Sequence, residues 1–483
     1  MHIGIIGAGV AAVALLDALA AEATAPGAIT VFDGSQAMWR GRPYQHDVAA
    51  VRVNAPPALM SVRAGDRGHY AQWVAERGDT TGYFDEGLGQ PIVPRAVYGD
   101  YLEQTARRAI DALRGRGWRV SVVNARVTAA DGTVLRTEDG GAHPVDRAVL
   151  CVGSGRPRDH YGLTGAPGYV GEPYPLARTL SGIAATAHVA VIGSGLTAVD
   201  IAAGLAANGH TGPISLLSRS GVLPYVQQRP APLAPVHLTP VNALRLAERG
   251  EIAFTELADL MRAELAGLGQ DFGTLAAEIG STESEEPAAR LRRQLADVDA
   301  THMGRRLLTM AIRTIGPIVW PRLAEADRKV LRDRHFRTIS SLSSPMVPYN
   351  ANIVLRLLDS GQLRLRRGVT EVEARGGGFV IDTDRAESGC TADVVLNAVN
   401  PPAYTTPQET EPLIGALLAG AAAEFGPDGG LLAEAGTRRL LVDGRPHPTW
   451  HVLGNLAADA MFIAANPPGL AAEAALLTRQ LAG

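Results

Sequence analysis

Residues 1–33 read MHIGIIGAGVAAVALLDALAAEATAPGAITVFD, and this stretch decides the fold. The apolar run 2–6 predicts a buried strand, and the alanine-rich run 13–22 predicts a helix. Between them lies a G-x-G-x-x-A turn, formed by Gly7, Ala8, Gly9, Val10, Ala11 and Ala12. In such a turn the glycines allow a tight bend and close approach to a pyrophosphate, which the helix N-terminus attracts. The stretch therefore predicts a Rossmann-like dinucleotide-binding domain at the N-terminus.

The residue after the next strand refines this prediction. A short strand is expected over 29–32, and Asp33 follows it directly. A carboxylate at this position accepts hydrogen bonds from the ribose hydroxyls of a dinucleotide. We therefore expect Asp33 to bind the first nucleotide.

The same arrangement returns at 188–219, which reads HVAVIGSGLTAVDIAAGLAANGHTGPISLLSR. A strand over 188–192, a helix over 199–208 and a strand over 214–217 are expected there. The turn consists of Gly193, Ser194, Gly195, Leu196, Thr197 and Ala198. Gly193 precedes Arg219 by 26 positions, as Gly7 precedes Asp33. Because Arg219 and Ser218 can bind a 2′-phosphate, the second site is predicted to prefer NADPH to NADH.

Composition removes several other classes of protein. A length of 483 residues gives room for about three domains, and a net charge of −4 gives no reason to expect nucleic acid or an anionic membrane as partner. Two cysteines, Cys151 and Cys390, provide no disulfide framework, redox pair or zinc site, and no metal site is predicted. Lys329 is the only lysine and lies outside any glycine-rich loop, which excludes P-loop and pyridoxal enzymes.

Two dinucleotide sites in one chain predict one resident redox cofactor and one diffusing hydride donor. FAD is the usual occupant of a turn within the first ten residues, so FAD is assigned to the first site and NADPH to the second. The apolar stretch 3–21 lacks a basic leading region, and Asp17 interrupts it, so it is not read as a signal peptide or membrane span. A cytoplasmic location is expected.

Further motifs resemble those of the two-dinucleotide-binding-domain flavoproteins related to the class B flavin monooxygenases and N-hydroxylating monooxygenases. They are found at 41–44, 53–61, 93–102, 150–153 and 453–456. The resemblance implies an α/β fold with an FAD domain over 1–180 and 390–483 and an inserted NADP domain over 181–389. It places seven further residues at the cofactor: Tyr44, Asn54, Met60, Arg95, Gly153, Gly454 and Asn455.

Two departures from related families matter. The stretch 169–175 lacks the histidine of the Baeyer–Villiger string, which disfavours that reaction. Asn455 stands where many relatives of the wider superfamily carry an aspartate.

The remaining chain is predicted to be largely helical from 255 to 336, with roughly four helices and a polar linker over 281–287. This helical block could cap the active site or enlarge the NADP domain. It ends in a basic run that could bind NADPH phosphates or form a solvated helix face: Arg328, Lys329, Arg332, Arg334 and Arg337.

A polar, proline-containing loop is expected over 343–350, before a helix over 351–359. Strands are expected over 379–382 and 394–397, and the last helix over 469–481. Asn54, Tyr349 and Asn350 are the candidate catalytic residues near the flavin. Asn350 could equally serve as a helix cap.

The leading hypothesis is an FAD-dependent, NADPH-using monooxygenase that acts through a C4a-(hydro)peroxyflavin. Its partners would be O₂ and a small polar metabolite, which is hydroxylated at an amine nitrogen or on a heterocycle. One alternative is an NADPH-dependent flavin reductase or dehydrogenase that inserts no oxygen. Another is a nucleotide-sensing or scaffolding flavoprotein in which FAD is structural. The oligomeric state stays open.

Overall fold

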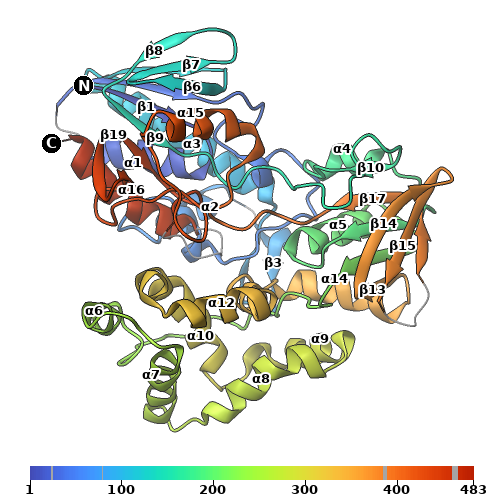
Figure 1. Cartoon of the computed structure of the whole chain (residues 1–483). Helices are drawn as coiled ribbons and strands as arrows, with labels where there is room; N and C mark the ends of the chain where they lie inside the picture. Colours follow the sequence, from blue (N-terminus) through green and yellow to red (C-terminus); the bar gives the residue numbers. More distant parts are fainter. Residues whose placement is uncertain (23–24, 79, 385–388, 459–465, 483) are drawn as a thin grey trace.

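The protein consists of two α/β domains and a layer of helices (Figure 1). The computed structural model describes residues 1–22, 25–78, 80–384, 389–458 and 466–482. The predicted fold class is confirmed, because each of the two glycine-rich turns follows a strand inside a parallel sheet. No helix in the described part of the chain combines the length and apolarity needed to cross a bilayer.

The first domain is built on a sheet with the strand order β18-β19-β9-β1-β2-β5. All neighbouring strands are parallel except β18 and β19. The strands are β1 (His2–Ile6), β2 (Ala28–Phe32), β5 (Arg119–Val123), β9 (Arg147–Leu150), β18 (Arg439–Val442) and β19 (Arg445–Val452). One face is covered by α1 (Val10–Glu22), α3 (Arg95–Gly115) and α16 (Pro467–Ala482). The other is covered by α15 (Glu411–Ala419) and a small sheet of β6 (Val127–Asp131), β7 (Val134–Thr137) and β8 (Ala142–Pro144).

The two faces of β1 explain this layering. Ile3 and Ile5 are fully buried in the core under the helices, whereas Ile6 lies in the core shared with the small sheet. Gly4 leaves space for Leu135, whose Cδ1 would lie 2.9 Å from a Cβ at position 4. Because successive side chains of a strand point to opposite faces, this short apolar run fits only between two layers. Outside the sheet the domain also contains α2 (His69–Glu76), β3 (Phe84–Asp85) and β4 (Gln90–Pro91).

The second domain repeats the plan with a five-stranded parallel sheet in the order β10-β17-β11-β12-β13. Its strands are β10 (Tyr169–Val170), β11 (Val189–Ile192), β12 (Ile214–Ser218), β13 (Leu363–Arg367) and β17 (Val394–Asn397). Its helices are α4 (Leu176–Ser181), α5 (Leu196–Ala207) and α14 (Pro348–Asp359). Its second face carries β14 (Val369–Arg375), β15 (Gly378–Thr383) and β16 (Cys390–Ala392). Val189 and Val191 face the helices, and Ala190 and Ile192 face the small sheet, as in β1.

The predicted domain boundaries at 180/181 and 389/390 are wrong for two strands. β10 precedes 181 but pairs with β17, and β17 follows 390 but pairs with β11 from Val189↔Val394 to Ile192↔Asn397. The chain therefore returns to the first domain only after Asn397. The apolar run 394–397 forms the strand between β10 and β11, as expected for a strand buried in a parallel sheet, and it therefore belongs to the second sheet.

The helical block is inserted between β12 and β13 and forms the lowest layer in Figure 1. Its helices are α6 (Pro240–Glu248), α7 (Phe254–Gly267), α8 (Phe272–Ser284), α9 (Pro287–Ala296), α10 (Gly304–Thr314), α11 (Gly316–Val319), α12 (Glu325–Arg334) and α13 (Phe336–Ser343). The stretch 255–336 thus holds more than the four helices expected.

Two predicted loops are partly helical. The linker expected over 281–287 is wrong up to Ser284, because α8 continues through it. The hydroxyls of Ser281 and Thr282 donate to the carbonyls of Glu278 and Ile279, each at 2.7 Å, so these polar side chains are satisfied within the helix. The loop expected over 343–350 ends at Val347. Pro348 occupies the first position of α14, where a missing N–H costs nothing.

Asp85 joins the two domains at the start of α14. Its buried carboxylate accepts a hydrogen bond from the Leu88 N–H at 3.0 Å and another from the Tyr349 N–H at 2.8 Å. The second bond satisfies a free N–H in the first turn of α14 and places negative charge at the positive end of that helix. Asp85 of the first domain therefore fixes where α14 of the second domain begins.

We predict that Asp85→Ala lowers the free energy of unfolding by about 1–3 kcal/mol, because one buried and one partly buried N–H group lose their acceptor. Urea unfolding followed by circular dichroism measures this loss. Asp111→Ala on the exposed side of α3 is the matched control and should leave the transition in place. Equal transitions for the two variants would show that the cap contributes nothing.

Candidate functional site

The first glycine turn leaves an open space at the carboxyl edge of the first sheet. Gly7 has φ +97°, and a Cβ there would lie 2.4 Å from the carbonyl oxygen of Cys151 on the neighbouring strand end. Only glycine fits this position. Gly9 has no atom within 4 Å of the position a Cβ would take, so a pyrophosphate can approach its backbone. Ala8 and Ala12 are fully buried, which keeps α1 close to β1.

Asp33 lies beside this turn, as predicted from its place after β2. Its Oδ2 accepts a hydrogen bond from the Ala8 N–H and its Oδ1 from the Ser35 N–H, both at 2.7 Å. These bonds orient the carboxylate and leave lone pairs for further donors, since an ionised carboxylate has about four acceptor positions. The ribose of a dinucleotide bound at Gly9 can supply such donors.

Two more predicted residues lie at the same sheet edge. Gly153 follows β9 with φ +67° and open space around its Cβ position, and Gly454 follows β19 with φ +95°. The Leu453 N–H donates to the Leu150 carbonyl at 2.9 Å, which keeps the two strand ends side by side. Asn455 comes next, and its carbonyl accepts a hydrogen bond from the Tyr404 N–H at 2.5 Å. The structure therefore brings the N-terminal turn and residues 153 and 454 to one edge.

The second turn repeats this geometry. Gly193 has φ +111°, and its Cβ would lie 3.4 Å from the backbone of Ala398, which follows β17 as Cys151 follows β9. The amide of Gly193 donates to Leu217 at 2.7 Å, and that of Gly7 donates to Phe32 at 2.8 Å. The part of each turn that approaches a pyrophosphate is followed by the first turn of a helix, α1 or α5. Val10 and Ala11 open α1; Leu196, Thr197 and Ala198 open α5.

Ser218 and Arg219 differ in what they can offer a ligand. The Ser218 hydroxyl is buried and accepts hydrogen bonds from the Ser194 hydroxyl at 3.1 Å and the Gly221 N–H at 3.0 Å. The Ser218 hydroxyl therefore stabilises the turn from within. Arg219 is exposed beyond the strand end, and no acid of the described chain forms an ion pair with it. Of the two, Arg219 has the free charge that a 2′-phosphate needs.

Arg95, which the resemblance places at the cofactor, lies against the second domain in this structure. Its Nη2 is 2.7 Å from Asp200 Oδ2 on α5, and the Asp200 side chain is completely buried. The Tyr174 hydroxyl donates to the same oxygen at 2.5 Å. Burial raises the pKa of the Asp200 carboxyl to about 6, against the opposing effects of Arg95 and Tyr174. Arg95 therefore links the two domains, because its charge is paired with a carboxylate.

The other predicted residues gather where the domains meet. Asn350 is buried in the first turn of α14, and its Nδ2 donates to Asn54 Oδ1 at 3.3 Å. The Tyr349 ring stacks under the Arg52 guanidinium, whose Cζ is 3.6 Å from the ring centroid. The structure thus places Asn54, Tyr349 and Asn350, nearly 300 residues apart in sequence, in one cluster.

Tyr44 and Met60 lie on the first-domain side of this junction. The Tyr44 ring meets the Tyr98 ring edge to face with centroids 4.7 Å apart, and the Tyr98 hydroxyl donates to the Met60 carbonyl at 2.8 Å. Burial raises the pKa of Tyr44. At the pH of a cell the phenol of Tyr44 is therefore neutral and can donate a hydrogen bond.

Sequence analysis did not list Arg42 as a site residue, and it named Arg337 only as one member of a basic run that could bind NADPH phosphates. Arg42 forms an ion pair with Glu172 at 3.2 Å and donates to Asn400, whose Nδ2 donates to Thr197 Oγ1 of the second turn at 3.1 Å. Arg337 lies beside Gly195 of the same turn. Arg42 stands in a motif stretch but gives no local sign of its partners, whereas Arg337 belongs to the basic run noted above.

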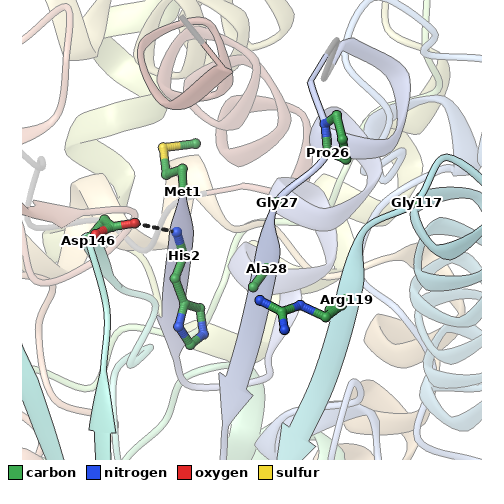
Figure 2. A pocket seen from close by; sticks show the side chains of 8 residues that line it. All are labelled: Met1, His2, Pro26, Gly27, Ala28, Gly117, Arg119 and Asp146. Atoms are coloured by element: carbon green, nitrogen blue, oxygen red, sulfur yellow. Dashed lines mark hydrogen bonds between the residues drawn. The ribbon is translucent and has the colours of Figure 1, made fainter.

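A hollow of about 430 Å³ lies at the opposite edge of the first sheet (Figure 2). Its lining includes His2, Ala28 and Arg119 at the amino ends of β1, β2 and β5, and Asp146, which accepts the His2 N–H at 2.6 Å. Ligands of parallel α/β sheets bind outside the carboxyl ends of the strands. The hollow is therefore on the wrong side to be part of the dinucleotide sites.

We predict that Asp200→Asn lowers the free energy of unfolding by about 3–5 kcal/mol, because the buried Arg95 guanidinium loses its counter-charge. Lys329→Ala, which breaks an exposed pair with Asp333, is the control and should cost less than about 1 kcal/mol. The midpoint of chemical unfolding reports both. A double change to Arg95→Met and Asp200→Leu should recover most of the loss, and an Asp200→Asn variant as stable as Lys329→Ala would contradict this account.

Comparison with known proteins agrees with this geometry. A family described as FAD-NAD(P)-binding matches residues 4–155. Among solved structures, L-lysine 6-monooxygenase from Pseudomonas syringae aligns over 100% of this chain and 97% of its own, with 15% identity and a TM-score of 0.56. The ornithine N-hydroxylase of Kutzneria sp. 744 aligns over 99% and 98%, with 13% identity and a TM-score of 0.58.

A lysine monooxygenase from Nocardia farcinica aligns over 99% of both chains, with 14% identity and a TM-score of 0.52. No curated protein sequence gives a significant match. Residues 4–155 thus match an FAD-NAD(P)-binding family, and the whole chain shares the fold of the lysine and ornithine monooxygenases with which it aligns.

Proposed function

We propose that the protein is an FAD-dependent, NADPH-using monooxygenase that hydroxylates a small polar metabolite. The observation that carries this proposal is the pair of matched glycine turns at two parallel sheet edges, one with a carboxylate and the other with a free arginine. The open space at Gly9 and the orientation of Asp33 fit FAD. Arg219 fits the 2′-phosphate that distinguishes NADPH from NADH.

The positions of the cysteines argue against disulfide reduction, another reaction that flavoproteins catalyse. Flavoproteins that reduce disulfides need a pair of neighbouring thiols, and the only two cysteines here lie in different domains. Cys151 is buried behind Gly7, and burial raises the pKa of its thiol, so it stays protonated and unreactive. Electrons from NADPH have no thiol route out of the protein. The proposal assigns O₂ as the electron acceptor.

Bound FAD would supply the chemistry that accepts hydride from NADPH and activates O₂. The residues of the chain bind and orient the reactants and keep water out. We assign this task to the cluster of Asn54, Tyr349 and Asn350. Asn350 Oδ1 is buried and has no hydrogen-bond partner, so a small repacking would let it orient a donor such as an amine.

Chemistry and the similar folds support the proposed substrate class. The structurally similar enzymes from Pseudomonas syringae and Kutzneria are named as lysine and ornithine hydroxylating enzymes. We propose N-hydroxylation of an amine as the first reaction to test and hydroxylation of a nitrogen heterocycle as the second. L-Lysine and L-ornithine therefore open the panel of trial substrates.

We predict that Arg219→Ala weakens NADPH binding by about 1.5–3 kcal/mol, the usual contribution of a charge-assisted hydrogen bond, and leaves NADH nearly unchanged. The dependence of the flavin reduction rate on nucleotide concentration measures both affinities under anaerobic conditions. Equal losses for NADPH and NADH would show that Arg219 does not bind the 2′-phosphate.

Oxygen insertion is tested with ¹⁸O₂ and the substrate panel. The proposal predicts one labelled oxygen atom in the hydroxylated product and, in stopped-flow spectra of the reduced protein mixed with O₂, a long-lived absorbance typical of a flavin C4a adduct. A flavin reductase would consume NADPH and show only the oxidised and reduced flavin spectra. Unlabelled products together with such spectra would refute the monooxygenase.

A further inference from the structure

The helical block contributes one arginine to the second nucleotide site. Arg337 lies in the first turn of α13, and its Nη2 is 3.4 Å from Ser194 Oγ and 3.5 Å from the Val222 carbonyl. A Cβ on Gly195 would lie 3.7 and 3.8 Å from its two terminal nitrogens, with no other atom nearer than 4 Å. The guanidinium of Arg337 therefore faces the part of the turn that would hold a nucleotide.

Arg337 differs from Lys329 and Arg332 of the basic run. Arg332 forms an ion pair with Asp428 at 2.5 Å, and Lys329 forms one with Asp333 at 2.7 Å. In the described chain no acidic side chain forms an ion pair with Arg337. Its hydrogen bonds are at the long end of the accepted range. Among the described residues, the positive charge of Arg337 is thus left without an acidic partner, whereas Arg332 and Lys329 each have one.

The charge that acts on Arg337 is another cation. Burial lowers the pKa of its guanidinium, and the positive charge of Arg219 lowers it further. Two like charges held near one another, one of them largely removed from water, repel and raise the free energy of the empty site. An anion bound between them would remove this repulsion. A phosphate suits this position, because it carries up to two negative charges and accepts several guanidinium hydrogen bonds.

The position between the turn and the end of β12 selects one phosphate of the nucleotide. The pyrophosphate has the backbone N–H groups of Gly195 and the start of α5, whereas the 2′-phosphate extends toward Arg219. Ser194, which Arg337 contacts, is hydrogen-bonded to Ser218, the residue before Arg219. Arg337 therefore lies on the side of the turn that faces the 2′-phosphate.

We propose that Arg337 binds the 2′-phosphate of NADPH together with Arg219, so that the helical block forms part of the nucleotide site and of its specificity. This inference rests on the proposed use of NADPH. In this proposal the inserted helices take part in nucleotide binding, because α13 adds a second positive charge to the one that Arg219 provides.

Binding of nucleotide fragments tests this directly. The FAD-loaded protein is titrated by calorimetry with adenosine 2′,5′-bisphosphate, which carries the 2′-phosphate, and with 5′-AMP, which lacks it. Arg337→Gln should weaken the bisphosphate about tenfold or more and change 5′-AMP less than twofold. Arg337→Lys should retain part of the preference. Arg334→Gln, which removes the same charge from the exposed end of α12, is the matched control and should change neither affinity.

The flavin spectrum and circular dichroism of each variant show whether it is folded. If folded Arg337→Gln binds the bisphosphate as well as Arg334→Gln does, or if it loses both nucleotides equally, the inference is overturned. In either case a selective loss in Arg219→Gln would leave the proposed use of NADPH intact. If the unaltered protein binds the two nucleotides alike, the preference for NADPH fails, and the role of Arg337 fails with it.

Discussion

The close passage of backbone over backbone at Gly7 and Gly193 is the constraint on which the structure depends. At each position the chain leaves a strand and turns with positive φ. A side chain at Gly7 would clash with Cys151, and one at Gly193 would lie in contact with Ala398. Because the turns pass close to the neighbouring strand ends, α1 and α5 begin at the sheet edge. The N–H groups of their first turns have no partner within the helix. The open space at Gly9 and the position of Arg337 beside Gly195 both depend on this geometry.

A second requirement is that the two sheet edges face a common region. The domains are joined by Arg95 with Asp200, by Arg42 with Glu172, and by Asp85 at the start of α14. Each contact links a charge of the first domain to the backbone or side chains of the second. Burial makes the first of them costly to leave unpaired, so it favours one arrangement of the domains over many. Asn54 and Asn350 meet only because of this arrangement.

Much of the fold could be predicted because its signals are local. A strand, a glycine turn and a helix occupy about 20 adjacent residues, so the pattern at 2–22 and again at 189–207 could be read directly. Residues whose partners lie far away in sequence could not be assigned in the same way. Arg95 stands in a motif and pairs with Asp200, 105 positions later, and Arg337 stands in an ordinary basic run beside a turn 142 positions earlier. The prediction of a linker at Ser281, Thr282 and Ser284 was wrong because their hydroxyls form hydrogen bonds within the helix.

The central claim is that one chain holds two different dinucleotides and passes electrons between them. Anaerobic titration of the purified protein with NADPH, followed by the absorbance of its flavin, tests this most directly. The account predicts a yellow protein with one FAD per chain whose colour is bleached by one equivalent of NADPH. A colourless protein that takes up no flavin, or a bound flavin that NADPH does not reduce, would contradict it.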